Sequence, residues 1–312
     1  MRYQNSNPEH LPHRARSIFR WGVWEPLAGK RKRTPPGRAA SLVEPDLALI
    51  HRGGKRLRLT WLGHAGFLIA MGGRHFLIDP LLSSRVARVY PNFAPTPLAP
   101  RDWPRIDAVL VSHNHYDHLD RTALRALSSE VPALVPSGLG SWFARWDRRP
   151  VRELSWWQTT QIGGVRVTLV PSRHWSRRGV FDVNRSHWGG FVLESGERAI
   201  YHAGDSGWFD GFAEIGRRFP GLEVAMLPIG AYEPGWFMES NHLNPEQACQ
   251  AFLETGAHIF VPMHWGSIRL TDETLCEPIE RVESWWREND PGDGRRLARQ
   301  SVGETLVIEQ QP

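Results

Sequence analysis

The 312-residue sequence is poor in cysteine and lysine and has no long apolar run. Its two cysteines, Cys249 and Cys276, are too few for a disulfide framework and lack the paired spacing of a zinc knuckle. No stretch reaches the roughly 18 apolar residues of a membrane span, and the polar first residues contain no signal-peptide core. We therefore expect a cytoplasmic protein, with peripheral attachment to the inner face of a membrane as an alternative.

Lysine occurs only three times, always within the first 58 residues, and all other basic residues are arginines. These 58 residues contain thirteen Lys and Arg against four Asp and Glu, a net charge of +9, so the other 254 residues carry −4 of the total of +5. A basic arm of this kind is expected to attract phosphates or the headgroups of an anionic membrane. A solvated, partly disordered extension is the alternative. The sequence divides into this extension, residues 1–56, and a folded domain, residues 57–312.

Short apolar segments and helical patterns alternate from residue 57 onward, and the apolar fraction of 41% is ample for a large core. The predicted strands cover residues 59–62, 66–70, 75–79, 107–112, 133–135, 165–170, 190–194, 199–202, 224–229 and 258–262. The predicted helices cover residues 120–129, 209–218 and 245–256. Strands in runs with helices between them favour an α/β fold of the α+β type, in which two sheets pack together under outer helices. The proline-rich loop 80–106 is expected to line a functional site.

Histidine, by contrast, is concentrated at one place. Residues 113–118 read His-Asn-His-Tyr-Asp-His and follow the predicted strand 107–112 directly. A turn after a strand can aim His113 and His115 at one metal ion, and Asp117 and His118 at a second. Paired ligands on a helix would instead lie four residues apart. The alternative is a polar loop that happens to be rich in histidine.

Three further candidate ligands each follow an apolar strand: His174, Asp205 and His264. A single histidine in such a place is more often a structural residue, but the same placement recurs three times. The seven candidates divide into two sets with one bridging carboxylate: His113, His115 and His174; Asp117, His118 and His264; and Asp205 between them.

This ligand set is rich in nitrogen and has no thiolate, which suits zinc first, with iron or manganese as alternatives. Two divalent ions about 3.5–4 Å apart lower the pKa of a shared water and polarise a carbonyl or phosphoryl oxygen. The predicted cofactors are therefore two divalent metal ions, and the predicted reaction class is metal-assisted hydrolysis.

Three segments, His113-Asn-His-Tyr-Asp-His118, Ala203-Gly-Asp205-Ser-Gly and Met263-His264-Trp-Gly266, resemble the metallo-β-lactamase fold, a four-layer αββα sandwich with a dinuclear metal site. A finer resemblance, over residues 57 to about 290, is to the phospholipases D that hydrolyse N-acyl-phosphatidylethanolamine. It rests on Trp61-Leu-Gly-His-Ala65, Asp79-Pro-Leu, Tyr116-Asp-His-Leu-Asp120, Ser172-Arg-His174-Trp175, Phe209 to Phe219, Pro228 to Met238 and His242 to Ala248.

The resemblance implies that residues 57–312 form a phosphodiesterase that converts N-acyl-phosphatidylethanolamine into phosphatidic acid and an N-acylethanolamine, by attack of a metal-bound hydroxide on phosphorus. Asp117 would orient the hydroxide or receive its proton while it binds metal. His242 would contact a phosphate oxygen or protonate the leaving alkoxide, and an indirect supporting role is the alternative. Asp79 is a candidate for orienting a metal-bound imidazole.

The expected substrate contacts lie in the loop after strand 224–229 and at one glycine-rich turn. They are Tyr232, Trp236, Phe237, Met238 and His64. The aromatic loop would hold acyl chains, and ordinary packing under a lid is the alternative. His64 would border the site, or would simply fix the turn that Gly63 and Gly66 make.

Other functions stay open at this point. The same fold includes lactonases that act on sugar phosphates, which share parts of these motifs. Outside the hydrolases, the chain would be a di-iron redox protein or a metal-binding module without turnover, although the di-iron oxygen reductases of this fold are expected to have Glu in place of His115. No added RNA-binding module is recognisable, so a nucleic acid partner is not expected. A homodimer remains open.

Overall fold

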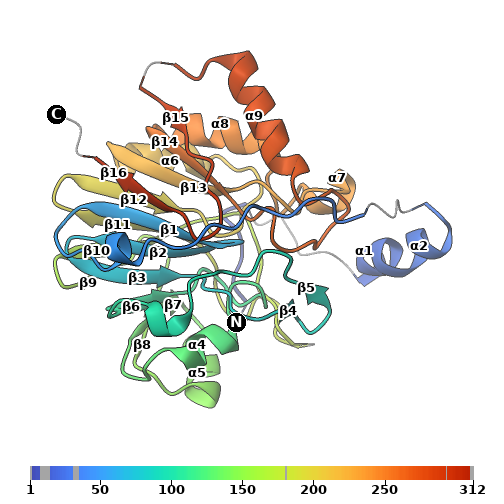
Figure 1. Cartoon of the computed structure of the whole chain (residues 1–312). Coiled ribbons are helices and arrows are strands. Elements are labelled where there is room, and N and C mark those ends of the chain that lie inside the picture. Colours follow the sequence, from blue (N-terminus) through green and yellow to red (C-terminus); the bar gives the residue numbers. More distant parts are fainter. Residues whose placement is uncertain (1, 8–14, 31–34, 180, 293, 310–312) are drawn as a thin grey trace.

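The computed structural model describes residues 2–7, 15–30, 35–179, 181–292 and 294–309. Within these residues, two seven-stranded sheets pack against each other and helices cover both outer faces (Figure 1). This is the four-layer αββα sandwich that the sequence predicted.

The first sheet has the strand order β16-β1-β2-β3-β6-β7-β8. Its strands are β1 (Leu57–Gly63), β2 (Gly66–Met71), β3 (Arg74–Ile78), β6 (Ala108–Leu110), β7 (Ala133–Pro136), β8 (Val151–Leu154) and β16 (Thr305–Ile308). Pairing is antiparallel from β16 to β3 and parallel from β3 to β8. The turn between β2 and β3 consists of Gly72 and Gly73, both at positive φ, as a tight two-residue hairpin turn requires.

The second sheet has the order β15-β14-β13-β12-β11-β10-β9. Its strands are β9 (Thr159–Ile162), β10 (Val165–Val170), β11 (Gly190–Ser195), β12 (Arg198–His202), β13 (Leu222–Pro228), β14 (Ile259–Met263) and β15 (Arg296–Leu297). Pairing is antiparallel from β9 to β12 and parallel from β12 to β15. Strands β10, β12, β13 and β14 therefore run in one direction, and the loops that follow them meet at one edge.

Helices α4 (Arg121–Ala126) and α5 (Gly140–Trp146) cover the first sheet, whereas α6 (Gly211–Arg218), α8 (Pro245–Thr255) and α9 (Glu277–Asn289) cover the second (Figure 1). Because both faces of each sheet are covered, inner strands such as β2 are apolar in both alternating sets of side chains. In β2, Phe67 and Ile69 belong to the large core that includes the space between the sheets, and Leu68 belongs to the smaller core under α4 and α5.

Shorter elements complete the chain. They are α1 (Ala15–Phe19), the π-helical turn η1 (Arg20–Trp24), α2 (Glu25–Leu27), α3 (Leu47–Ile50), the 3₁₀ turn η2 (Pro100–Asp102), α7 (Gly235–Met238) and the hairpin of β4 (Arg85–Val86) and β5 (Tyr90–Pro91). The described parts of residues 2–56 contact the domain. Pro36 accepts a backbone hydrogen bond from Leu275, and Leu42 forms a β-bridge with Val302. The division at residue 56 stays a prediction.

The predicted elements are present, with two helices and one strand shortened. The strand predicted over residues 107–112 covers only Ala108–Leu110. Leu127 takes an extended conformation (φ −90°, ψ 148°), so the helix predicted over residues 120–129 ends at Ala126. The helix predicted over residues 209–218 begins at Gly211. Helix α8 begins at Pro245, as predicted. Its N-cap residue Asn244 and Gln247 form a reciprocal capping box. Cys249 is fully buried in α8.

Candidate metal centre

All seven predicted ligands lie at the sheet edge where the strands end. His113 follows β6, His174 follows β10, Asp205 follows β12 and His264 follows β14. Asp120 caps α4, where its side chain accepts a hydrogen bond from the Thr122 amide, and this helix start closes the turn that holds the His-rich segment. The loop geometry therefore brings side chains from both sheets to one place.

The first group consists of three imidazoles and a carboxylate. His115 Nδ1 lies 2.8 Å from His113 Nε2 and 3.2 Å from His174 Nε2. Asp205 Oδ2 lies 3.8 Å from His113 Nε2 and 3.7 Å from His174 Nε2. The ligand atoms of these four residues all lie within 4.8 Å of one another. This is the set that the sequence predicted for one ion, together with Asp205, the predicted bridging carboxylate.

The second group lies beside the first and shares Asp205 with it. Asp117 Oδ2 is 3.7 Å from His118 Nε2 and 3.6 Å from His264 Nε2. Asp205 reaches the same two rings, with Oδ2 3.2 Å from His118 Nε2 and Oδ1 3.3 Å from His264 Nε2. Asp205 therefore contacts imidazoles of both groups, which is the bridging position predicted for it.

The donor atoms fit metal binding. His118 Nε2, His264 Nε2 and Asp205 Oδ1 are buried and have no hydrogen-bond partner within the described residues. A buried polar atom without a partner costs about 1–3 kcal/mol, so three such atoms aimed at one space indicate a ligand there. Imidazole nitrogens and carboxylate oxygens without thiolates suit zinc and similar divalent ions.

The electrostatics of the site favour a cation between the two carboxylates. Burial raises the pKa of Asp205, but His118 and His264 lower it further, so the net pKa lies well below its ordinary value. Burial lowers the pKa of His264, but Asp205 and Asp117 raise it to about 9. The carboxylates thus stay ionised and stabilise positive charge beside them. Burial and the neighbouring imidazoles hold the pKa of His113 well below its ordinary value.

A second layer of residues fixes the orientation of the rings. His118 Nδ1 donates to Asp79 Oδ2 over 2.8 Å, and His174 Nδ1 donates to the Asn241 carbonyl over 3.0 Å. Ser112 donates from its hydroxyl and its amide to the two oxygens of Asp79. In both His118 and His174 the hydrogen bond occupies Nδ1 and leaves Nε2 facing the centre, which fixes the tautomer that binds metal. The predicted orienting role of Asp79 is in accord with these contacts.

A family model described as the beta-lactamase superfamily domain matches residues 74–265, which is more than half of the chain. The chain belongs to the metallo-β-lactamase superfamily.

Relatives within the superfamily connect the chain to metal-dependent hydrolases. An uncharacterized protein of Mycobacterium tuberculosis is 34% identical over 294 residues, which are 90% of this chain and 77% of the relative. The N-acyl-phosphatidylethanolamine-hydrolyzing phospholipase D 1 of Caenorhabditis elegans is 34% identical over 244 residues, 72% of this chain and 68% of that protein. A UPF0173 metal-dependent hydrolase of Pelotomaculum thermopropionicum is 31% identical over 233 residues, 73% of this chain and 92% of that protein.

Solved structures show that the fold is shared by different enzymes. An isothiocyanate hydrolase from Delia radicum gut bacteria superposes with a TM-score of 0.66 at 20% identity, over 80% of this chain and 99% of that chain. CmlA, a diiron β-hydroxylase from Streptomyces venezuelae, gives a TM-score of 0.63 at 22% identity, over 82% of this chain and 55% of that chain. At these identities the likeness shows the fold alone, so the reaction must be argued from the site.

Among the neighbours of the candidate metal centre that the sequence reasoning missed is Asn5. Its side chain donates to the His174 carbonyl over 2.8 Å and accepts from the His174 amide over 3.1 Å. It also accepts from Trp188 Nε1 over 3.3 Å. No sequence signal could have found this contact, because the residues are 169 positions apart and Asn5 belongs to the arm rather than to the matched domain.

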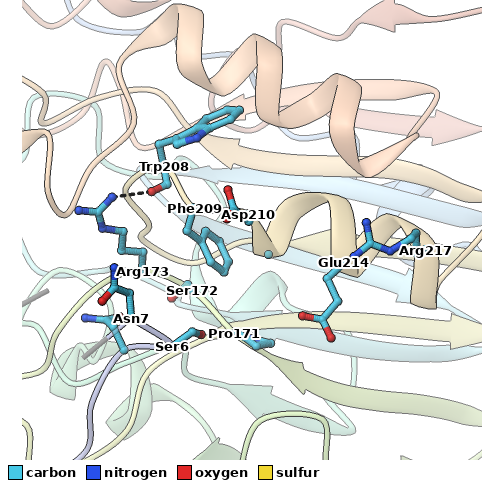
Figure 2. A pocket seen from close by; sticks show the side chains of 12 residues that line it. Ser6, Asn7, Pro171, Ser172, Arg173, Trp208, Phe209, Asp210, Glu214 and Arg217 are labelled. Atoms are coloured by element: carbon cyan, nitrogen blue, oxygen red, sulfur yellow. Dashed lines mark hydrogen bonds between the residues drawn. The ribbon is translucent and has the colours of Figure 1, made fainter. Parts of the chain in front are cut away.

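Asn5 also lines a cavity of about 490 Å³. Figure 2 shows this cavity, with Ser6 and Asn7 on one side and Trp208, Phe209 and Asp210 on the other. None of the seven candidate ligands lines it. Asn5 lines the cavity and is bonded to the backbone of His174, so its loss would expose that backbone to water from the cavity.

We expect Asn5→Ala to lower metal affinity by about 10- to 100-fold, the range for the loss of a supporting partner. The reason is that His174 would lose two backbone hydrogen bonds and the fixed position of its ring. Competition with a chromophoric chelator measures this affinity without any assay of turnover. Asn184→Ala is a less suitable control, because the Asn184 side chain accepts a hydrogen bond from the Ser176 amide, close to His174. Asn289→Ala, at the end of α9, is the matched control. Equal affinity of Asn5→Ala and wild type would contradict the assignment.

Two predicted site residues border the centre in different ways. His64 is buried, and its Nε2 lies 2.9 Å from Asp117 Oδ2, so the ring supports that carboxylate. Its predicted substrate contact stays a prediction. His242 is half-buried, and its ligand atom lies within 4.8 Å of those of Asp205 and His264. It therefore stands beside the second group, where it can contact a bound substrate.

The aromatic loop residues are divided between packing and exposure. Tyr232 is buried, and its hydroxyl donates to Glu277 Oε1 over 2.8 Å. Phe237 and Met238 are buried in α7, whereas the Trp236 side chain is 42% exposed. The interpretation as ordinary packing accounts for the observed contacts of Tyr232. An acyl-chain contact stays a prediction for all four residues.

Proposed function

We propose that this chain is a dinuclear-metal phosphodiesterase of the phospholipase D type. Its substrate would be N-acyl-phosphatidylethanolamine, and its products phosphatidic acid and an N-acylethanolamine. The observation that carries the proposal is the pair of neighbouring His/Asp groups whose imidazoles all lie close to the single carboxylate of Asp205. The substrate is supported by the 34% identity to the phospholipase D of Caenorhabditis elegans and to a second one, mitochondrial, of Saccharomyces cerevisiae.

The two groups would hold one divalent ion each, zinc being the first candidate. Bound there, two such ions would lower the pKa of a water and neutralise charge that develops on the phosphoryl oxygens. Asp205 holds the groups together, and Asp79 and the Asn241 carbonyl fix the rings of His118 and His174. The residues are therefore organised before substrate binds, which is the condition for electrostatic catalysis.

Asp117 and His242 would act on the reacting groups. Burial raises the pKa of Asp117, but His118, His264 and His64 lower it further, so the net pKa lies well below its ordinary value. An ionised Asp117 can accept a hydrogen bond from the attacking water and orient it. His242, beside the second group, would donate a hydrogen bond to a phosphate oxygen or a proton to the departing alkoxide.

The reaction balances as a hydrolysis. A bond forms between water oxygen and phosphorus, and the bond between phosphorus and the ethanolamine oxygen breaks. The departing alkoxide takes up a proton and leaves as N-acylethanolamine, and the phosphate remains on the diacylglycerol as phosphatidic acid. This outcome distinguishes the phospholipase from a lactonase, which opens a ring ester and leaves phosphate untouched.

We expect purified, metal-loaded protein to release N-acylethanolamine from vesicles that contain N-acyl-phosphatidylethanolamine. His115→Ala should reduce that rate by at least about 10³-fold, because it removes a ring that contacts both His113 and His174. Mass spectrometry of both products measures the reaction. If wild type forms neither product yet opens a lactone, the phospholipase proposal is wrong and the metallo-hydrolase fold is unaffected.

A further inference from the structure

One surface of the molecule exposes apolar side chains that the fold leaves uncovered. Residues 15–27, here called the N-terminal helical segment, comprise α1, η1 and α2 and project from the body of the protein at the end where α7 and the β4–β5 hairpin lie (Figure 1). Phe19 is 58% exposed, Val23 42% and Leu27 81%. Residues spaced four apart share one side of a helix. The segment therefore presents an apolar stripe to solvent, with Trp24 beside it at 56% exposure.

The opposite side of this segment is attached to the loop that contains α7. Trp21 stacks on Phe237, with ring centroids 5.0 Å apart and planes at 20°. The Arg20 guanidinium lies 4.2 Å from the centroid of the Trp236 ring. Glu25 is nearly buried and accepts from Arg20 Nε over 2.8 Å. These contacts fix which side of the segment faces outward, and they place the exposed part of Trp236 next to the stripe.

Charge identifies the partner that this surface fits. Residues 14–33 contain seven Lys and Arg against a single Glu. Of these, Arg16, Arg20 and Lys30 are described and exposed. Two copies of the chain that met through this surface would bring like charges together. An anionic lipid bilayer offers the complement, because basic residues bind its headgroups and aromatic residues settle at its interface.

We propose that the N-terminal helical segment, together with Trp236, is the face by which this protein docks on an anionic membrane. Phe19, Val23 and Leu27 enter the boundary between headgroups and acyl chains, and the flanking cations bind lipid phosphates. The inference rests on the proposed function in one respect, namely that the substrate resides in a bilayer. The contacts of the N-terminal helical segment with α7 connect it to the stretch of chain that leads from β13 to His242.

The test uses the full chain with Phe19→Ser and Leu27→Ser combined. Deleting residues 1–40, the simpler experiment, would also remove Asn5 and the contact of Pro36 with Leu275. The exposed pair supports no core packing, so the variant keeps its fold. Trp146→Ser is the matched control, because this ring is 47% exposed but lies on α5, at the far side of the first sheet (Figure 1).

Binding is measured by co-sedimentation with vesicles of phosphatidylcholine and phosphatidylglycerol. All proteins carry His115→Ala, so that no turnover is involved. We expect the double variant to bind the vesicles at least about tenfold more weakly, because the variant lacks two large apolar side chains that would otherwise move from water into the bilayer. The control should bind like the parent, and binding by the parent should weaken with salt. Equal vesicle binding by the double variant and the parent would overturn the proposal.

Two further measurements separate this proposal from its alternatives. In the active protein, the double substitution should slow hydrolysis of vesicle substrate and leave hydrolysis of a short-chain, monomeric substrate unchanged. If vesicle binding depends on the segment but the active protein forms no product, the docking face is supported and the phospholipase activity is refuted. If sedimentation equilibrium instead shows a dimer that the double variant breaks, with unchanged vesicle binding, a second copy covers the stripe and the membrane proposal fails.

Discussion

Replacing Asp205 by alanine is expected to remove hydrolysis almost completely, with kcat/KM lowered by about 10³-fold or more. The reason is geometric: this one carboxylate lies 3.2 Å from His118 and 3.3 Å from His264 in the second group, and 3.7 Å from His174 in the first. Without it, four neighbouring imidazoles lose the negative charge that compensates a bound cation. Elemental analysis should therefore show a fall in metal content alongside the loss of rate.

Two controls define the role of Asp205. Asp205→Asn preserves size and one acceptor but removes the charge, so it should retain more metal than the alanine variant and still lose most activity. Asp107→Ala removes a carboxylate that binds Arg74 and the His75 amide, at the start of β3 rather than at its end. Its metal content should match wild type. Full metal occupancy in Asp205→Ala would refute the bridging role.

Gly230→Ala should be the most damaging substitution by a single methyl group. A Cβ at this position would lie 2.1 Å from the carbonyl oxygen of His264, which is backbone and cannot rotate away. His264 already has a φ of +64°, so its backbone has little freedom to adapt. We expect the free energy of unfolding to fall by about 3 kcal/mol, together with weaker metal binding, because the ring moves with its backbone.

Chemical denaturation and chelator competition on the same sample measure both effects of Gly230→Ala. Gly164→Ala, in the turn between β9 and β10, is the control, because no atom lies within 4 Å of its added Cβ. Its stability should stay within about 0.5 kcal/mol of wild type. Wild-type stability of Gly230→Ala would mean that the loop after β13 moves freely, in conflict with the close packing of Gly230 on His264.

The candidate metal centre was predictable because its signals are local. An apolar strand followed at once by histidine or aspartate is visible within ten residues, and the structure brings all seven such residues together. Elements at the edges of the fold were harder to predict from the sequence. Strand β8 has only one buried residue of four, and β9 has none, so neither shows the apolar pattern that identifies an inner strand. Helix α9 buries only three residues of its thirteen, and the sequence reasoning missed it for the same reason.

The sequence by itself determined the fold class, the donor atoms and the strand ends that carry them, since these depend on neighbouring residues. Tertiary structure alone decided that Asn5, far along the chain, holds the backbone of His174, and that His64 supports Asp117. It also decided which side of residues 15–27 is exposed, because that depends on the stacking of Trp21 on Phe237. Such contacts join segments remote in sequence, where no spacing rule applies and only the packed chain sets the distance.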